Sequence, residues 1–239
     1  MHFRPLPGLT IAAIISLAIL LVLGTWQMQR RAEKHELLAQ IEQRQSMPPA
    51  PAELILPVGD YALFRPTTAT GLFLNASESY VIESRADTGP TRPGYRVLTP
   101  FRFTGGDIII VDRGWVPADL KAPHTRKQGQ VEGQTEIEGS FRKPAAGSSF
   151  TPPPDLNTRT FYARSTLDIA RQDALTLRTP FVFEATSRVE GGPEPLPTAV
   201  KIPDNHLNYA LTWYSLAAVL VAIYLIYHKQ QGRLGTRKQ

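Results

Sequence analysis

Apolar residues gather in two long uncharged runs, one near each end of the chain. The first covers residues 8–28 and contains the stretch "LTIAAIISLAILLVL"; the second covers residues 206–227. About 20 residues in a helix span the roughly 30 Å of a bilayer's hydrocarbon core. The pattern therefore predicts two transmembrane helices, at 8–28 and 206–227.

The first run has an alternative interpretation as a cleaved signal peptide, because His2 and Arg4 precede it. Signal peptidase needs small residues around its cut. The run ends instead in "GTWQM" at 24–28, which favours an uncleaved anchor.

Between the two runs, apolar and polar residues alternate with the period of strands. The stretches "YRVLTPFRF" and "DIIIVDRGWV" flank residues 104–106, Thr-Gly-Gly, and predict a hairpin. In "VEGQTEIEGSF", Val131, Thr135, Ile137 and Phe141 share one face and glutamates occupy the other, which predicts a strand with one wet face. Further strands are expected at "TGLFLN", "SYVIESR" and "TPFVFEAT".

Two helices are expected in the same region. The stretch "RRAEKHELLAQIEQRQ" should continue the first span until the prolines at 48–51, and "STLDIARQDAL" should form a short helix capped by Ser165, with Asp168 in its first turn. Proline-rich stretches at 151–155 and 191–203 are expected to be loops. The fold class is a membrane protein in which two transmembrane helices flank a mainly antiparallel β-rich (α+β) domain. The β-rich domain is expected to cover residues 29–205. Residues 1–7 and residues 228–239 are expected to form short terminal tails.

Charge sets the expected orientation. Residues 48–205 carry 17 Lys and Arg against 18 Asp and Glu, so the basic surplus lies beside the apolar runs. This pattern argues against nucleic-acid binding. Four basic residues and no acidic one follow the second span, which predicts a cytoplasmic C-terminus, and two spans then place the N-terminus there too. Arg30, Arg31 and Lys34 favour the opposite orientation for the first span taken alone; the cleaner asymmetry of the second span decides. The domain should be extracytoplasmic.

The sequence carries few signs of catalysis. It has no cysteine, which excludes disulfides, thiolate catalysis and cysteine-ligated metals. The stretch "HELLA" at 35–39 lacks the second histidine of a zinc-protease helix, and no nucleophile elbow, phosphate loop or dinucleotide fingerprint is present. We predict that the protein is not an enzyme.

His206 is the residue that stands out chemically. On a helix beginning near Asn205, His206 shares a face with Tyr209, Ala210 and Trp213. A helix N-terminus disfavours added positive charge, so the imidazole should stay neutral and able to ligate a metal. Haem iron on His206, with the macrocycle against Ala210 and its edge on Trp213, is one interpretation. The alternative is that these residues are amphipathic anchors at the membrane interface.

Four sequence blocks resemble one known family. They are "LGTWQMQR" at 23–30, "GYRVLTPF" at 94–101, "VDRGWVP" at 111–117 and "NHLNYALTWYSLA" at 205–217. In this order, and within a two-span topology, they resemble the surfeit locus protein 1 family of assembly factors for cytochrome c oxidase and related haem–copper oxidases. One block departs: Phe161 stands where the family tends to have tryptophan, and Ser165 follows Arg164 where it tends to have aspartate.

The resemblance implies a role in inserting or protecting haem A in the largest oxidase subunit. It maps the family's signature histidine onto His206 as a haem-iron ligand, and it places Trp26, Gln27 and Arg30 of the first-span block at the same membrane level. Trp26 and Arg30, together with Tyr209 and Trp213 on the helix face of His206, are the expected haem contacts. The implied partners are the largest subunit of the oxidase, haem A synthase and membrane lipid. The sequence before the first span is too short for a transit peptide, so we expect a bacterial inner membrane with the domain in the periplasm.

Two rival functions remain open. In one, the protein is a haem-free scaffold whose β-rich domain binds the nascent oxidase subunit. In the other, it is a membrane-tethered hydrolase or sensor, which the missing catalytic motifs disfavour.

Overall fold

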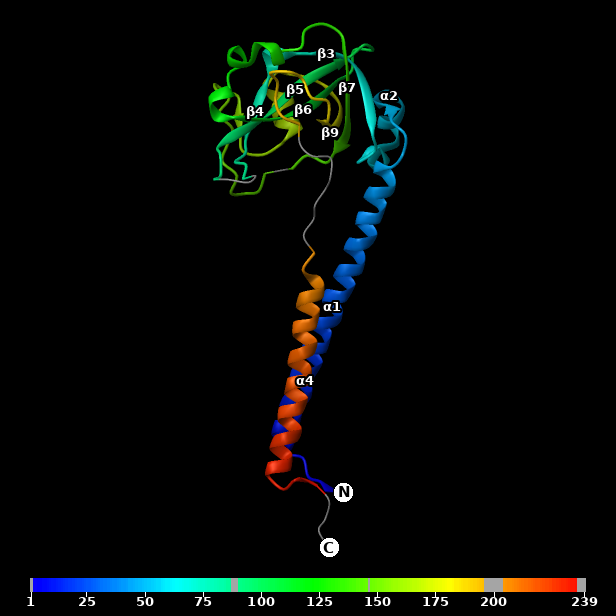
Figure 1. Ribbon diagram of the computed structural model, residues 1–239, viewed down its shortest axis with the longest axis vertical. Coiled ribbons are helices and arrows are strands. Elements are labelled where there is room, and N and C mark those ends of the chain that lie inside the picture. Colours follow the sequence, from blue (N-terminus) through cyan, green and yellow to red (C-terminus); the bar gives the residue numbers. More distant parts are fainter. Residues whose placement is uncertain (1, 87–89, 146, 196–203, 236–239) are drawn as a thin grey trace. The chain divides into compact units, whose positions relative to one another are not determined.

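The computed structural model describes residues 2–86, 90–145, 147–195 and 204–235 (Figure 1). The chain forms two compact units: a helical unit of Met1–Gln40 with Lys201–Gln239, and a β-rich unit of Ile41–Val200. Part of the proline-rich stretch predicted at 191–203, and the last four residues of the basic tail, lie outside the described residues.

The helical unit is built from α1 (Pro7–Gln45), as far as Gln40, and α4 (His206–Gln230), which run side by side (Figure 1). Both helices are long and apolar enough to cross a membrane, as predicted. Helix α1 continues unbroken past its apolar run and ends before Pro48, also as predicted.

Small residues let the two helices approach closely. A Cβ on Gly24 would lie 2.6 Å from the ring of Tyr214, and Ala210 and Ala217 are buried. Thr10 Oγ1 lies 2.7 Å from the hydroxyl oxygen of Tyr224. Without a hydrophobic driving force in lipid, such close packing and interhelical hydrogen bonds are what hold membrane helices together.

The chain ends meet in a way that the sequence did not predict. The two-residue strands β1 (His2–Phe3) and β10 (Leu234–Gly235) pair in antiparallel fashion, and the amide of Arg4 donates to the carbonyl of Arg233. This pairing joins the segment before α1 to the segment after α4.

The β-rich unit contains a barrel-like sheet. Strands β3 (Thr67–Phe73), β7 (Thr135–Arg142), β9 (Leu177–Ala185), β6 (Ile108–Pro117) and β5 (Gly94–Phe103) pair in that order. A further pairing between β3 and β5 closes the circuit. Short strands β4 (Ser79–Ile82) and β8 (Thr160–Phe161) extend from β5, and β2 (Ala50–Pro51) lies on β3. The sheet is mainly antiparallel, as predicted, but β6 and β9 run parallel.

The predicted hairpin is confirmed, and the predicted wet-faced strand is confirmed from Thr135 onward, whereas residues 131–134 lie outside β7. β5 and β6 join through a turn in which Gly106 has φ of 94°, a conformation that favours glycine. In β7, Ile137 and Phe141 are buried while Glu136 and Glu138 are exposed. The alternation therefore places one face of β7 in the core.

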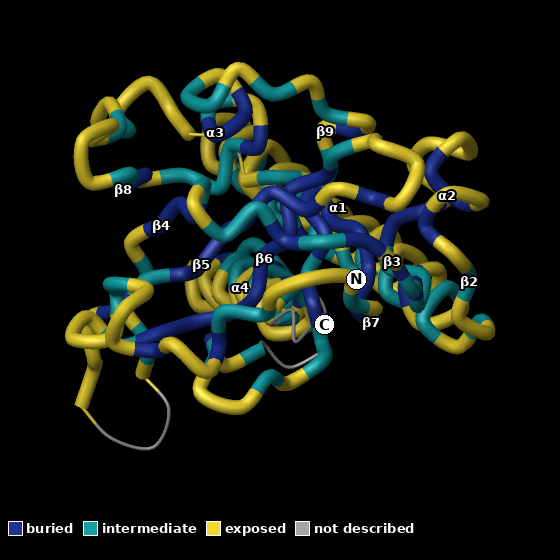
Figure 2. The backbone as a smooth tube through the Cα atoms, turned by 90° about the horizontal axis from the view of Figure 1, so that it is seen from above, coloured by how far each residue is buried: buried dark blue, intermediate teal, exposed yellow. Residues whose placement is uncertain are grey.

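Aromatic side chains fill the barrel interior. Phe101 packs edge-on against Phe73, and Phe141 packs edge-on against Phe183. Helix α2 (Ala52–Ile55) and the 3-10 segment Leu56–Ala62 add buried side chains to the same core. Figure 2 shows burial concentrated on β5 and β6 and exposure in the loops.

A second apolar cluster holds helix α3 (Thr166–Gln172) to the outside of the barrel. Ser165 caps this helix by accepting from the amide of Asp168, as predicted, and Ile169 is fully buried. Phe161, at the position where tryptophan was expected, is only 2% exposed in the same cluster. Its role is therefore packing. The remaining short 3-10 segments are Asn75–Ser77, Ala118–Leu120 and Pro123–Gly129.

Candidate functional site

His206 is the first residue of α4 and has two hydrogen-bonding partners among the described residues. Its backbone amide donates to Asp204 Oδ1 at 3.1 Å, and its ring Nδ1 lies 2.8 Å from Gln27 Oε1 on α1. An amide oxygen can only accept, so Nδ1 carries the proton and donates. In a neutral ring with this hydrogen bond, the lone pair is on the other nitrogen, Nε2.

The accessibility of Nε2 distinguishes His206 from the second histidine of α4. His206 is half-buried, and its Nε2 has no hydrogen-bond partner in the described part of the chain but is not enclosed. His228, near the other end of the helix, is 0% exposed, and its Nε2 is enclosed next to the rings of Phe3 and Tyr224. Of these two histidines, His206 is the one whose Nε2 a ligand could reach without rearrangement.

Asp204 ties the segment before α4 to α1. Its Oδ2 lies 2.8 Å from His35 Nε2 and 3.8 Å from Arg31 Nε. The hydrogen bond from His35, followed by that from the His206 amide, holds the pKa of Asp204 below its usual range. His35 is therefore already engaged by a carboxylate.

The other expected contacts lie next to Gln27 on α1 or within the first turns of α4, but they do not hydrogen-bond to His206 in the described structure. Trp26 and Tyr209 are 46% and 56% exposed, and Trp213 is half-buried. Arg30 forms an ion pair with Glu33 at 2.9 Å and lies over the Trp26 ring. Tyr209 follows His206 by three residues on α4 and Trp26 precedes Gln27 on α1, and such exposed aromatic rings suit a flat apolar ligand.

The structure does not support the expected contact between a macrocycle and Ala210. Ala210 is only 1% exposed, so its methyl group faces packed atoms and offers no open surface to a macrocycle. The exposed ring of Tyr209, the residue before it, provides such a surface.

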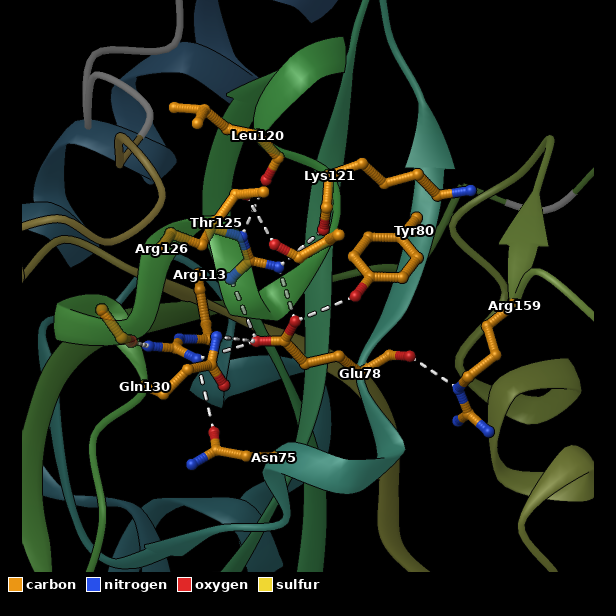
Figure 3. A network of polar contacts seen from close by, with 12 residues as sticks. Asn75, Glu78, Tyr80, Arg113, Leu120, Lys121, Thr125, Arg126, Gln130 and Arg159 are labelled. Atoms are coloured by element: carbon orange, nitrogen blue, oxygen red, sulfur yellow. Dashed lines mark hydrogen bonds and ion pairs between the residues drawn. The ribbon is translucent and has the colours of Figure 1, made fainter.

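The central sequence blocks serve the fold of the β-rich unit. Glu78, 2% exposed, accepts hydrogen bonds from two buried arginines, Arg113 at 3.1 Å and Arg126 at 2.6 Å (Figure 3). Gln130 and the hydroxyl of Tyr80 also donate to it. Burial, together with the charge of Glu78, raises the pKa of Tyr80.

Both arginines have further acceptors, so the cluster is saturated. Arg126 also donates to the carbonyls of Leu120 and Lys121, and Arg113 donates to that of Gly129. These bonds fasten residues 118–130 to the barrel (Figure 3). A buried carboxylate with this many donors is a structural element, with no spare site for a proton or a ligand.

A second buried network joins the blocks at 94–101 and 111–117. Arg96 Nε lies 2.6 Å from Asp112 Oδ2, and Arg164 lies 2.7 Å from Glu184 and 3.6 Å from Asp112. Burial raises the pKa of Asp112, and Arg96 acts against that rise. Arg164, which lacks the expected following aspartate, thus finds its acidic partner in Glu184 on β9.

A bulge interrupts β6 at Gly114. The pairing of β5 with β6 shifts register opposite Val97, and Gly114 adopts φ of 116° against the carbonyl of Glu194. Trp115 is 2% exposed and donates from its indole nitrogen to the carbonyl of Glu83, so it belongs to the core.

Sequence reasoning missed the contact from Gln27 to His206 and the tie from Asp204 to His35. Both pairs join residues about 170 to 180 positions apart, and no local pattern reports such a pairing. The indication in the sequence that Gln27 and His206 could meet was that both were expected at the same membrane level. Among the described residues, no group of three or more His, Cys, Asp or Glu side chains could hold a bare metal ion.

Comparison with known proteins identifies the family of this chain. Residues 14–218 match the sequence profile of the SURF1 family. The chain is 31% identical over 232 residues to a SURF1-like protein of Monosiga brevicollis, covering 90% of this chain and 86% of the relative. It is 33% identical over 215 residues to human Surfeit locus protein 1, covering 82% and 69%. A SURF1-like protein of the bacterium Rickettsia bellii is 27% identical over 229 residues, covering 94% and 92%. A match of this extent shows that the chain belongs to the SURF1 family.

Proposed function

We propose that this protein is a membrane-anchored assembly factor for a haem–copper oxidase, and that it contacts haem through Nε2 of His206. The observation that carries the proposal is the accessible nitrogen lone pair, held at the start of a helix that is apolar enough to span a membrane. Membership of the SURF1 family supports the assignment to oxidase maturation.

The residues present fit a haem in character. Haem iron binds a neutral imidazole nitrogen, and a haem macrocycle is flat and apolar with two anionic propionates. Nε2 of His206 offers a nitrogen for the iron, and the exposed rings of Trp26 and Tyr209 suit the flat apolar macrocycle. Arg31, partly exposed, is the cation near Asp204 that could pair with a propionate.

The proposal includes the cellular setting inferred from the sequence. Both termini lie in the cytoplasm of a bacterium, the β-rich unit lies in the periplasm, and the cofactor is haem A. The partners are the largest oxidase subunit and, as the source of the cofactor, haem A synthase. The protein positions and shields haem without catalysing a reaction.

Complementation in cells tests the assembly function. Cells that lack this gene would receive the wild-type chain, His206→Ala or His124→Ala, and the haem A content of the purified oxidase subunit would be measured. His124 is an exposed residue of the β-rich unit and serves as a matched control. We expect the control to restore haem and His206→Ala to fail. Normal haem in oxidase from the deletion strain would refute the proposal.

One observation favours the scaffold function, with or without haem. A cavity of about 410 Å³ lies between residues 147–154 and the start of α3, and is lined by Phe161 and Tyr162. Phe150, in the loop that borders it, is 95% exposed. If the domain binds the oxidase subunit here, Phe150→Ser should reduce co-purification of the subunit and leave haem on the isolated protein unchanged.

A further inference from the structure

Among the described residues, one hydrogen bond holds the ring of His206. Its Nδ1 lies 2.8 Å from Oε1 of Gln27. The carboxylate of Asp204 does not compete for the ring, because its two oxygens accept from the His206 backbone amide and from His35. Among the described residues, Gln27 is therefore the acceptor that the ring uses.

This contact decides which ring nitrogen can bind iron. A neutral imidazole has one N–H and one lone pair, and the hydrogen bond made by one nitrogen sets the role of the other. We infer that Gln27 is a positioning residue that fixes the proton of His206 at Nδ1 and presents the Nε2 lone pair outward. The identity of the ligand rests on the proposed function; the position of the proton does not.

Gln27 reaches His206 because the helices are close at this level. Gln27 lies three residues after Gly24, where the absence of a side chain admits the ring of Tyr214. Outer-shell partners of this kind orient a ligating histidine and typically contribute 10- to 100-fold in metal affinity.

The choice of an amide has a chemical consequence. A carboxylate at this position would raise the basicity of the imidazole more strongly, and an unpaired charge at the edge of the bilayer would be costly. A neutral acceptor fixes the tautomer and leaves the imidazole a weaker donor to iron. A weaker donor suits a carrier that must release its ligand to another protein.

The tautomer can be measured directly on the full-length, haem-free protein. The chain, labelled with ¹⁵N at histidine and purified in detergent, would be studied by long-range ¹H–¹⁵N correlation at about pH 8.5, where imidazole is neutral. The His206 signals are those missing in His206→Ala. We expect the proton at Nδ1 in the wild type, and loss of that preference in Gln27→Leu.

Thr25→Val is the matched control, because it removes another polar contact between the same two helices. It should leave the His206 tautomer unchanged. A wild-type proton at Nε2, as would follow if Gln27 presented its amide nitrogen, overturns the inference. So does a Gln27→Leu spectrum identical to that of the wild type.

A titration with haem A separates this inference from the proposed function. If both hold, Gln27→Leu should bind haem 10- to 100-fold more weakly than Thr25→Val, and Gln27→Glu should restore tight binding. Equal affinity of Gln27→Leu and Thr25→Val would overturn the role of Gln27 in binding. If the wild type binds no haem, the proposed function fails, while the tautomer measurement still decides the position of the proton.

Discussion

Glu78 provides the sharpest test of how the β-rich unit is stabilised. Its carboxylate is 2% exposed and is the shared counter-ion of Arg113 and Arg126. Glu78→Gln keeps the shape of the side chain and removes its charge. It also introduces an amide NH2 group, which donates hydrogen bonds, next to guanidinium groups, which can only donate and cannot accept them.

The expected cost follows from these contacts. Removing one partner of a buried ion pair costs about 3–5 kcal/mol, because the remaining charge stays buried without a counter-charge. Here two guanidinium groups lose their counter-charge, but the carbonyls of Leu120, Lys121 and Gly129 continue to accept from them. We therefore expect about 3–5 kcal/mol, a large share of the roughly 5–15 kcal/mol typical of a folded domain.

Urea unfolding in mild detergent would measure this cost. Trp115 is the sole tryptophan of the β-rich unit in the sequence, so its fluorescence reports on that unit once Trp26 and Trp213 are changed to phenylalanine. With an m value of about 2 kcal/mol/M, the midpoint should fall by roughly 1.5–2.5 M. Glu132→Gln, at an exposed glutamate, should change stability by less than about 0.5 kcal/mol. Equal midpoints for the two variants would refute the reasoning.

Three further predictions concern backbone and loop positions. Gly24→Ile should force α1 and α4 apart and lower cross-linking between single cysteines placed in each helix, whereas Gly8→Ile, which has open space around it, should not. Gly114→Ala should cost more than about 2 kcal/mol in urea unfolding because of its positive φ and the nearby carbonyl, and Gly105→Ala should be nearly neutral. Hydrogen bonds from two backbone amides and a hydroxyl group lower the pKa of Asp155. These hydrogen bonds order the turn that begins at Asp155. Because they lower the pKa of Asp155 in the folded state, this ordering should be complete above the ordinary aspartate pKa of about 4 and be lost as the pH falls through the lower pKa of the folded state. Hydrogen exchange of those amides that stays slow at pH 1 would contradict this.

Much of the fold follows from local sequence patterns. The two apolar runs, the Thr-Gly-Gly hairpin and the alternation around Ile137 depend on residues close together in the chain, and the structure confirms each. Closure of the barrel does not follow in this way. It depends on the pairing of β3 with β5 and the parallel pairing of β6 with β9, which are set by long-range packing.

The candidate site was only partly predictable. The position of His206 on a helix face was visible in the sequence, but its partner Gln27 lies on the other span. The adjacent charges in "VDRGWVP" gave no sign that Asp112 and Arg113 belong to two separate buried networks. From sequence alone, charged residues in a strand are predicted to be exposed, because their ion-pair partners on other elements are not known.

The central claim is that His206 ligates haem, and resonance Raman spectroscopy combined with absorption tests it most directly. The protein would be purified in detergent from cells confirmed to make haem A, as wild type, His206→Ala and His35→Ala. We predict bound haem with an iron–histidine band in the wild type and in His35→Ala, and loss of both haem and band in His206→Ala. A haem-free wild type, or a His206→Ala protein that keeps an unchanged spectrum, would contradict the account.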